Sequence, residues 1–144
     1  MIVLDTNVVS EGLRVDGHAG VKDWLGQQSH ETLFLAAPTL AELLFGIEVL
    51  PDGQRKSGIA ERLRQFLHRR FDGRILGFDQ RAAEVYAPMV GRARRAGSAI
   101  AMADGQIAAI AAARGFAVAT RDVKPFIAGG VTVINPWTSG TAAP

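Results

Sequence analysis

Short apolar runs alternate along the chain with longer segments in which apolar residues recur every three or four positions. The first run, Ile2-Val3-Leu4, is continuous and ends abruptly at an acid, which is typical of a buried strand. Similar runs predict further strands at residues 32–36, 74–78, 116–120 and 131–135. The alternation of strands with amphipathic segments predicts an α/β domain with a mainly parallel central sheet.

The longer segments predict helices, several of which have recognisable ends. The predicted helices are residues 6–13, a turn around 21–25, a helix opened by Pro38, residues 59–71, a helix from the cap Asp79 to about residue 96, and residues 101–115 closed by Gly115. One interpretation of Asp122 places it in a turn with Lys124 and Pro125. We expect one domain over residues 1–137, followed by a disordered tail at 138–144.

Composition narrows the class of protein. The 144 residues are 48% hydrophobic and 21% charged, which is an ordinary balance for a globular domain. No apolar run approaches the length of a membrane helix, and there is no secretory signal pattern. The chain contains no cysteine, which excludes disulfides and thiolate metal sites and fits a cytoplasmic protein. The net charge of +2 leaves a polyanionic partner open.

Four acids fall where a single cleft could form. Asp5 and Asp122 each follow a predicted strand, and Glu42 is expected in the first turn of the helix after strand 32–36. Asp104 interrupts a helix rich in alanine and isoleucine. Because ligands of parallel sheets bind outside the carboxyl ends of the strands, these carboxylates should converge there. Such a cluster would repel itself unless it held a divalent cation such as Mg²⁺, whose bound water can attack a phosphodiester.

Each acid also has an ordinary structural interpretation. Asp5 could cap a helix, and Thr39 with Glu42 fits a capping box. Asp104 suits the dipole at the start of a helix, and Asp122 could belong to a turn. Taken one at a time, these interpretations equal or outweigh catalysis, and only the joint placement favours a site.

Other chemistries lack their residues. There is no glycine-rich phosphate loop after a strand and no Gly-x-Ser-x-Gly elbow. The three histidines fall in predicted loop or surface positions without a His-x-x-His pair. The arginines of residues 62–70 and 92–95 could follow RNA phosphates, but such runs are more often solvated helix faces. Trp24 and Trp137 are interpreted as core or interface residues rather than as platforms for stacked bases.

Four segments in order, "MIVLDTNVVSE", "PTLAELLFGI", "AMADGQIAAIA" and "VATRD", resemble the PIN-domain ribonucleases, and most closely the VapC/FitB branch of toxin–antitoxin toxins. The resemblance covers Met1 to about Trp137. It implies a three-layer α/β/α sandwich and a metal-dependent endoribonuclease. It implies the catalytic acids Asp5, Glu42, Asp104 and Asp122, with Asp5 and Asp104 as the main ligands of Mg²⁺ or Mn²⁺.

The resemblance also implies supporting residues and partners. Thr6, Asn7 and Thr120 match positions that hold the acids by hydrogen bonds. The partners implied are a cognate antitoxin, an RNA substrate and a second copy of the chain in a homodimer. DNA would be bound only indirectly, through the antitoxin, and no membrane is involved.

The sequence departs from the family pattern after the fourth strand. Relatives commonly carry Thr-Arg-Asn, two residues, and then Asp-Phe, whereas here Asp122 takes the Asn position and Pro125 replaces the later Asp. Asp122 is therefore the expected fourth carboxylate. Two alternatives of other classes stay open: a PIN fold that binds without catalysis, and a phospho-acceptor signalling domain, which would normally show paired acids after the first strand.

Overall fold

A single five-stranded sheet runs through the computed structural model, which describes residues 1–139. All four strand pairings are parallel, and the order β3-β2-β1-β4-β5 places β1 at the centre. The elements in chain order are β1 (Ile2–Leu4), α1 (Thr6–Leu13), α2 (Ala19–Gln27), a 3-10 turn (His30–Thr32), β2 (Leu33–Ala36), α3 (Ala37–Glu48), α4 (Gln54–Phe71), β3 (Ile75–Leu76), α5 (Gln80–Arg95), α6 (Met102–Ala112), β4 (Ala117–Ala119), α7 (Val123–Ala128) and β5 (Val133–Ile134).

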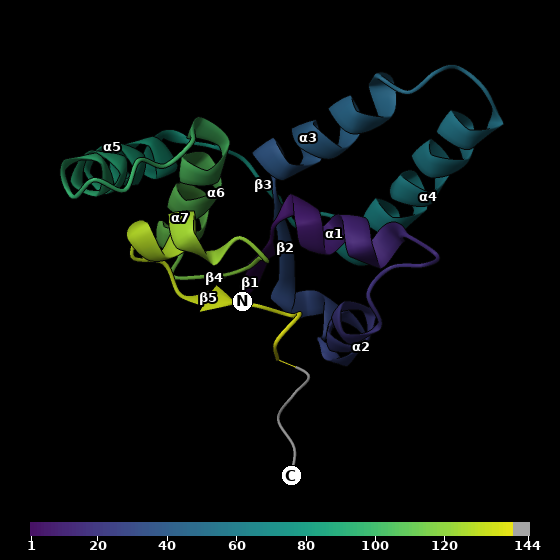
Figure 1. The fold of residues 1–144 in the computed structure, drawn as a ribbon, viewed down its shortest axis with the longest axis horizontal. Helices are drawn as coiled ribbons and strands as arrows, with labels where there is room; N and C mark the ends of the chain where they lie inside the picture. Colours follow the sequence, from purple (N-terminus) through teal and green to yellow (C-terminus); the bar gives the residue numbers. More distant parts are fainter. Residues whose placement is uncertain (140–144) are drawn as a thin grey trace, which may run out of the picture.

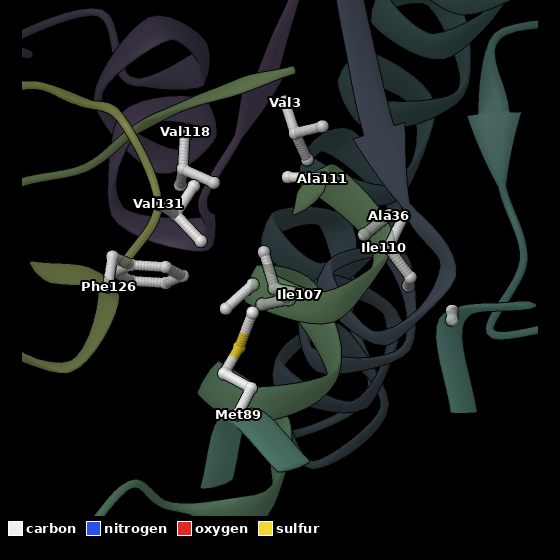
Figure 2. Close-up of a cluster of buried hydrophobic side chains, with 11 residues drawn as sticks. Val3, Ala36, Met89, Ile107, Ile110, Ala111, Val118, Phe126 and Val131 are labelled. Carbon is white, nitrogen blue, oxygen red and sulfur yellow. The ribbon is translucent and has the colours of Figure 1, made fainter. Parts of the chain in front are cut away.

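Helices cover both faces of the sheet and produce the three-layer α/β/α sandwich that the sequence predicted (Figure 1). Successive strand residues point to opposite faces. Val3 packs among the side chains of α5, α6 and α7, a cluster in which Ile107 and Met89 meet above the sheet (Figure 2). Leu4 instead packs with buried residues of α1, α2 and α4. The fully apolar strands therefore reflect burial on both faces.

Three details differ from the prediction. Helix α4 begins at Gln54, five residues before the predicted start. The prediction began late because the first turn of α4 is polar and carries no apolar periodicity. Strand β3 contains only two residues. Residues 123–128 form helix α7 rather than a turn. Pro125 lies in the first turn of that helix, where a missing backbone N–H costs no hydrogen bond.

The expected tail falls mainly outside the described residues, which end at Ser139. Thr138 and Ser139 both donate backbone N–H groups to the Asn135 carbonyl, at 3.1 Å each. Within residues 1–139, no helix is long and apolar enough to cross a membrane.

Strand register aligns the functional segments at one edge of the sheet. Leu4 is level with Leu35 in β2 and with Ala119 in β4. The Asp5 N–H continues this ladder by donating to the Ala119 carbonyl at 2.9 Å. Asp5 and Thr120 therefore lie side by side, each directly after the carboxyl end of its strand.

Gly105 lets α6 approach α5 closely just behind Asp104. A Cβ atom at Gly105 would stand 2.8 Å from Tyr86 Cε2 and 3.1 Å from Val90 Cγ2. Gly105→Ala is therefore expected to lower the free energy of unfolding by about 1–3 kcal/mol, because an overfilled contact forces side chains off their rotamers. Urea unfolding followed by circular dichroism measures the loss.

Gly58→Ala is the matched control, since a Cβ atom at Gly58 in exposed α4 would meet nothing within 4 Å. It should raise stability by about 0.5–1 kcal/mol, because alanine loses less backbone entropy in a helix. Equal shifts for the two variants would contradict the tight packing of α5 against α6.

Candidate active site

Asp5 lies at the end of central strand β1 with only 6% of its surface exposed. Its Oδ1 accepts the Thr6 N–H at 2.8 Å, and its Oδ2 accepts the Thr120 hydroxyl at 2.7 Å and the Asn7 side-chain amide at 3.0 Å. Burial raises the pKa of Asp5, these hydrogen bonds partly offset the effect, and the charge of Glu42 adds to the rise. Asp5 is the N-cap of α1, and one of its three side-chain hydrogen bonds, from the Thr120 hydroxyl, comes from outside that helix.

Glu42 belongs to the second turn of α3, so its placement in the first turn was wrong. The capping-box interpretation is wrong as well: α3 begins after Ala36, which makes no side-chain cap, and the buried Thr39 hydroxyl has no partner among the described residues. Glu42 instead accepts a short hydrogen bond from the Thr6 hydroxyl. Thr6 thus binds Asp5 through its backbone and Glu42 through its side chain.

Asp104 lies in the first turn of α6, half-buried, where the helix dipole favours a negative charge. Burial raises its pKa most, followed by the charges of Asp5, Asp122 and Glu42. The same four carboxylates that the sequence grouped therefore lie within electrostatic range of one another. The dipole does not compensate for their repulsion.

Asp122 is exposed at the start of α7 and makes no side-chain cap. Its backbone N–H donates to the Thr120 hydroxyl oxygen at 3.0 Å, and the Arg121 N–H donates to Asn7 Oδ1 at 3.1 Å. Asn7 and Thr120 thereby link the segment after β4 to Asp5. The three residues expected to support the acids all lie in this network.

No lysine, arginine or histidine among residues 1–139 forms an ion pair with these four acids. Among residues 1–139, the ion pairs within 4 Å involve other carboxylates, such as Asp79 with Arg114. In the same residues, no three acid or histidine side chains already stand close enough to hold one metal ion together. A hard cation bound by one or two carboxylates and several waters, as Mg²⁺ usually is, needs no such group of three.

A groove begins beside Thr6 and Glu42 and extends between α1, α3 and α4, with a volume of about 400 Å³. Leu13, Leu43, Ile47 and other apolar residues form much of its wall. Arg14, Arg55 and Arg62 also line it. The groove that begins at Glu42 is therefore mainly apolar and also lined by three arginines.

The sequence interpretation missed Arg121 as a residue beside the site, whereas Trp137 packs against the core as expected. Arg121 lies between Thr120 and Asp122, and its guanidinium sits 5.7 Å from the ring centre of Trp137. Only the position of Arg121, directly after a strand and beside an acid, could have indicated it. The contact itself joins segments that are distant in sequence.

A parallel α/β sheet with unbalanced carboxylates at the ends of its central strands defines a class of site that suits a hard divalent cation. The chain matches the model of the PIN domain over residues 2–128. It belongs to the PIN-domain family, and the resemblance found in the sequence is confirmed.

Similar proteins narrow the branch of this family. Over 137 residues the chain is 46% identical to the VapC ribonuclease Y4jK of Sinorhizobium fredii, covering 95% of this chain and 98% of that one. It is 45% identical over 137 residues to the toxin FitB of Neisseria gonorrhoeae, with 95% and 99% covered. A solved structure of FitAB bound to an IR36 DNA fragment is similar with a TM-score of 0.90 at 44% identity, covering 95% of this chain and 96% of that chain. These matches place the chain among the VapC/FitB-like members.

Proposed function

We propose that the protein is a Mg²⁺- or Mn²⁺-dependent endoribonuclease and the toxin of a toxin–antitoxin pair. The observation that supports it most directly is the placement of Asp5, Glu42, Asp104 and Asp122 within electrostatic range of one another. Burial and then the charges of the other three acids raise the pKa of Asp104. The relatives named as a toxin and as a ribonuclease, at 45% and 46% identity, support RNA as the substrate.

The donor chemistry fits a hard cation, since the site offers carboxylate oxygens and the chain has no cysteine. Asp5 and Asp104 would hold the ion. When bound, the ion would supply an activated water and stabilise the charge that develops on the phosphate.

The protein's own residues orient the site. Asp5 is fixed by three hydrogen bonds, and Thr6 holds Glu42 beside it. Glu42 is thereby positioned to orient water or the substrate at the cleft. Asp122 is exposed within electrostatic range of Asp104 and would act on the substrate directly or through water.

The antitoxin is proposed to dock in the groove between α1, α3 and α4. An apolar segment fits its wall, and a cationic side chain such as arginine would reach the carboxylates next to Thr6. DNA in the solved FitAB complex belongs to that complex. We propose that this chain likewise meets DNA only through its antitoxin.

Cleavage of a labelled single-stranded RNA by the purified chain is expected in Mg²⁺ or Mn²⁺ and should cease in EDTA, because the carboxylates alone supply no activated water. Asp104→Asn should be inactive while remaining folded. Asp23→Asn makes the same chemical change at an exposed position of α2 and should keep full activity. Undiminished cleavage in EDTA would rule the mechanism out.

Growth tests address the toxin proposal separately. Expression of the chain alone should arrest growth, while Asp104→Asn or co-expression with the neighbouring gene should restore it. Equal growth in all cases, with soluble protein present, contradicts the toxin role. Lack of cleavage in every ion would favour the non-catalytic binding alternative.

A further inference from the structure

Arg121 is a basic residue fixed beside the four acids that forms no ion pair within the described part of the chain. Its backbone N–H is held by Asn7 Oδ1 at 3.1 Å, and Asn7 in turn donates to Asp5. The backbone of Arg121 therefore belongs to the same network as the buried carboxylate. Its side chain is exposed.

Trp137 provides the seat for the guanidinium. The Arg121 Cζ lies 5.7 Å from the centre of the indole ring. The backbone N–H of Trp137 donates to Asn135 Oδ1 at 3.0 Å. The Trp137 side chain packs against the buried cluster that includes residues of α1 and α2. The centre of the His18 ring, at the start of α2, lies 6.3 Å from the centre of the Trp137 ring, where the segment after β5 passes α2 (Figure 1).

This arrangement leaves the hydrogen-bonding capacity of Arg121 unused. A carboxylate partner would occupy the N–H donors that lie in the guanidinium plane. A cation–π contact with a ring does not occupy them, while it restricts the side chain to fewer conformations. The guanidinium N–H groups of Arg121 are therefore available to a ligand next to the acidic site.

We propose that Arg121, seated on Trp137, binds a phosphate of single-stranded RNA and holds the strand across the acidic site. The inference rests on the proposed function and names a substrate contact for it. An approaching RNA strand is repelled by four carboxylates, which a single divalent ion only half neutralises. A guanidinium beside them offsets that repulsion and can bind two phosphate oxygens at once.

The test measures binding of a fluorescein-labelled oligouridine of about 20 nucleotides by anisotropy at several salt concentrations. It uses the full chain with Asp104→Asn as background, so that cleavage does not interfere. Arg121→Gln should weaken binding about tenfold and reduce the slope of log affinity against log salt by about 0.7, the value for one phosphate contact on a single strand. Arg121→Lys should keep the slope and lose part of the affinity, since it retains charge without the fork.

Arg81→Gln is the matched control. Arg81 is exposed near the start of α5, beside Asp79, which pairs with Arg114 beyond the far end of α6 at 3.2 Å. Helix α6 runs from Met102 to Ala112, so about 12 Å of helix separates its far end from Asp104. Arg81→Gln should leave both affinity and slope unchanged.

A second arm uses chains with Asp104 intact and measures cleavage. Arg121→Gln should raise KM more than it lowers kcat, whereas a purely structural role of Arg121 would change the melting temperature without changing the salt slope.

If the wild type cleaves RNA but Arg121→Gln binds RNA with unchanged affinity and slope, the proposed contact is wrong and the nuclease proposal stands. If binding depends on Arg121 but no ion supports cleavage, the nuclease proposal fails and the contact stands. Equal losses from Arg81→Gln and Arg121→Gln, or no RNA binding at all, would overturn the inference.

Discussion

Without metal, Asp104→Asn is expected to unfold at a higher temperature than the wild type. In Mg²⁺ or Mn²⁺, the same variant should cleave RNA at least about a hundredfold more slowly than the wild type. The loss of activity follows because a bound ion supplies several kcal/mol of transition-state stabilisation, and each tenfold in rate corresponds to about 1.4 kcal/mol. The gain in stability follows because the variant removes one of four charges that repel one another.

The repulsion is visible at Asp104 itself. Burial and the charges of Asp5, Asp122 and Glu42 raise its pKa, and no cation among residues 1–139 lies within ion-pair distance of it. Relieving such strain at a functional site typically raises stability by about 1 kcal/mol. Mg²⁺ should then raise the melting temperature of the wild type more than that of the variant, since binding to the folded state alone stabilises it.

The stability difference should depend on pH in one direction. Because the pKa of Asp104 is raised in the folded state, the folded protein keeps this proton at a pH at which the unfolded chain has lost it. The wild type therefore gains stability relative to Asp104→Asn as the pH falls through the raised pKa. The gap should be widest near neutral pH and should close below the ordinary pKa of aspartate.

Thermal melting in EDTA, from about pH 7 to about pH 3, measures this gap. Asp122→Asn is the matched comparison, because it removes a carboxylate of the same cluster from an exposed position. Calorimetric Mn²⁺ titration should show weaker binding for Asp104→Asn and retained binding for Asp122→Asn. A lower melting temperature for metal-free Asp104→Asn would mean that Asp104 stabilises α6 as a helix-dipole partner instead.

The strands and their acids were predictable because each rests on local pattern. The run before Asp5 and the run before Asp122 are apolar on both faces, so their ends could be located and the acids placed at one edge of the sheet. Helix α7 was missed because Pro125 suggests a turn, and sequence alone does not show that it falls in a first turn. The start of α4 was missed because its polar residues carry no periodicity.

The connections within the site were not predictable, because they join distant segments. The bond from Thr6 to Glu42 spans 36 positions and the bond from Thr120 to Asp5 spans 115. The capping box that Thr39 and Glu42 fit in sequence does not form, and the fold instead brings the Thr6 hydroxyl of α1 to Glu42. Arg121 and Trp137 likewise meet only after β4 and β5 are paired.

Asp5→Asn should have the opposite effect on metal-free stability from Asp104→Asn, although both should abolish cleavage. Asp5 is buried and accepts three hydrogen bonds, from the Thr6 backbone, the Asn7 amide and the Thr120 hydroxyl. An asparagine there offers one acceptor oxygen, so its own amide must face a donor. The expected net loss is about 1–2 kcal/mol, because a buried donor left without an acceptor costs more than the relief of repulsion returns.

Urea unfolding in EDTA of the wild type, Asp5→Asn, Thr120→Val and the double variant measures this network. Thr120→Val removes the hydroxyl donor while keeping the shape of the buried side chain. The sum of the two single-variant losses in unfolding free energy should exceed the loss in the double variant, because Asp5 and Thr120 contact one another directly. If Asp5→Asn instead unfolds at higher urea than the wild type, charge repulsion outweighs hydrogen bonding at Asp5, and the ordering network around it stabilises the site less than its geometry indicates.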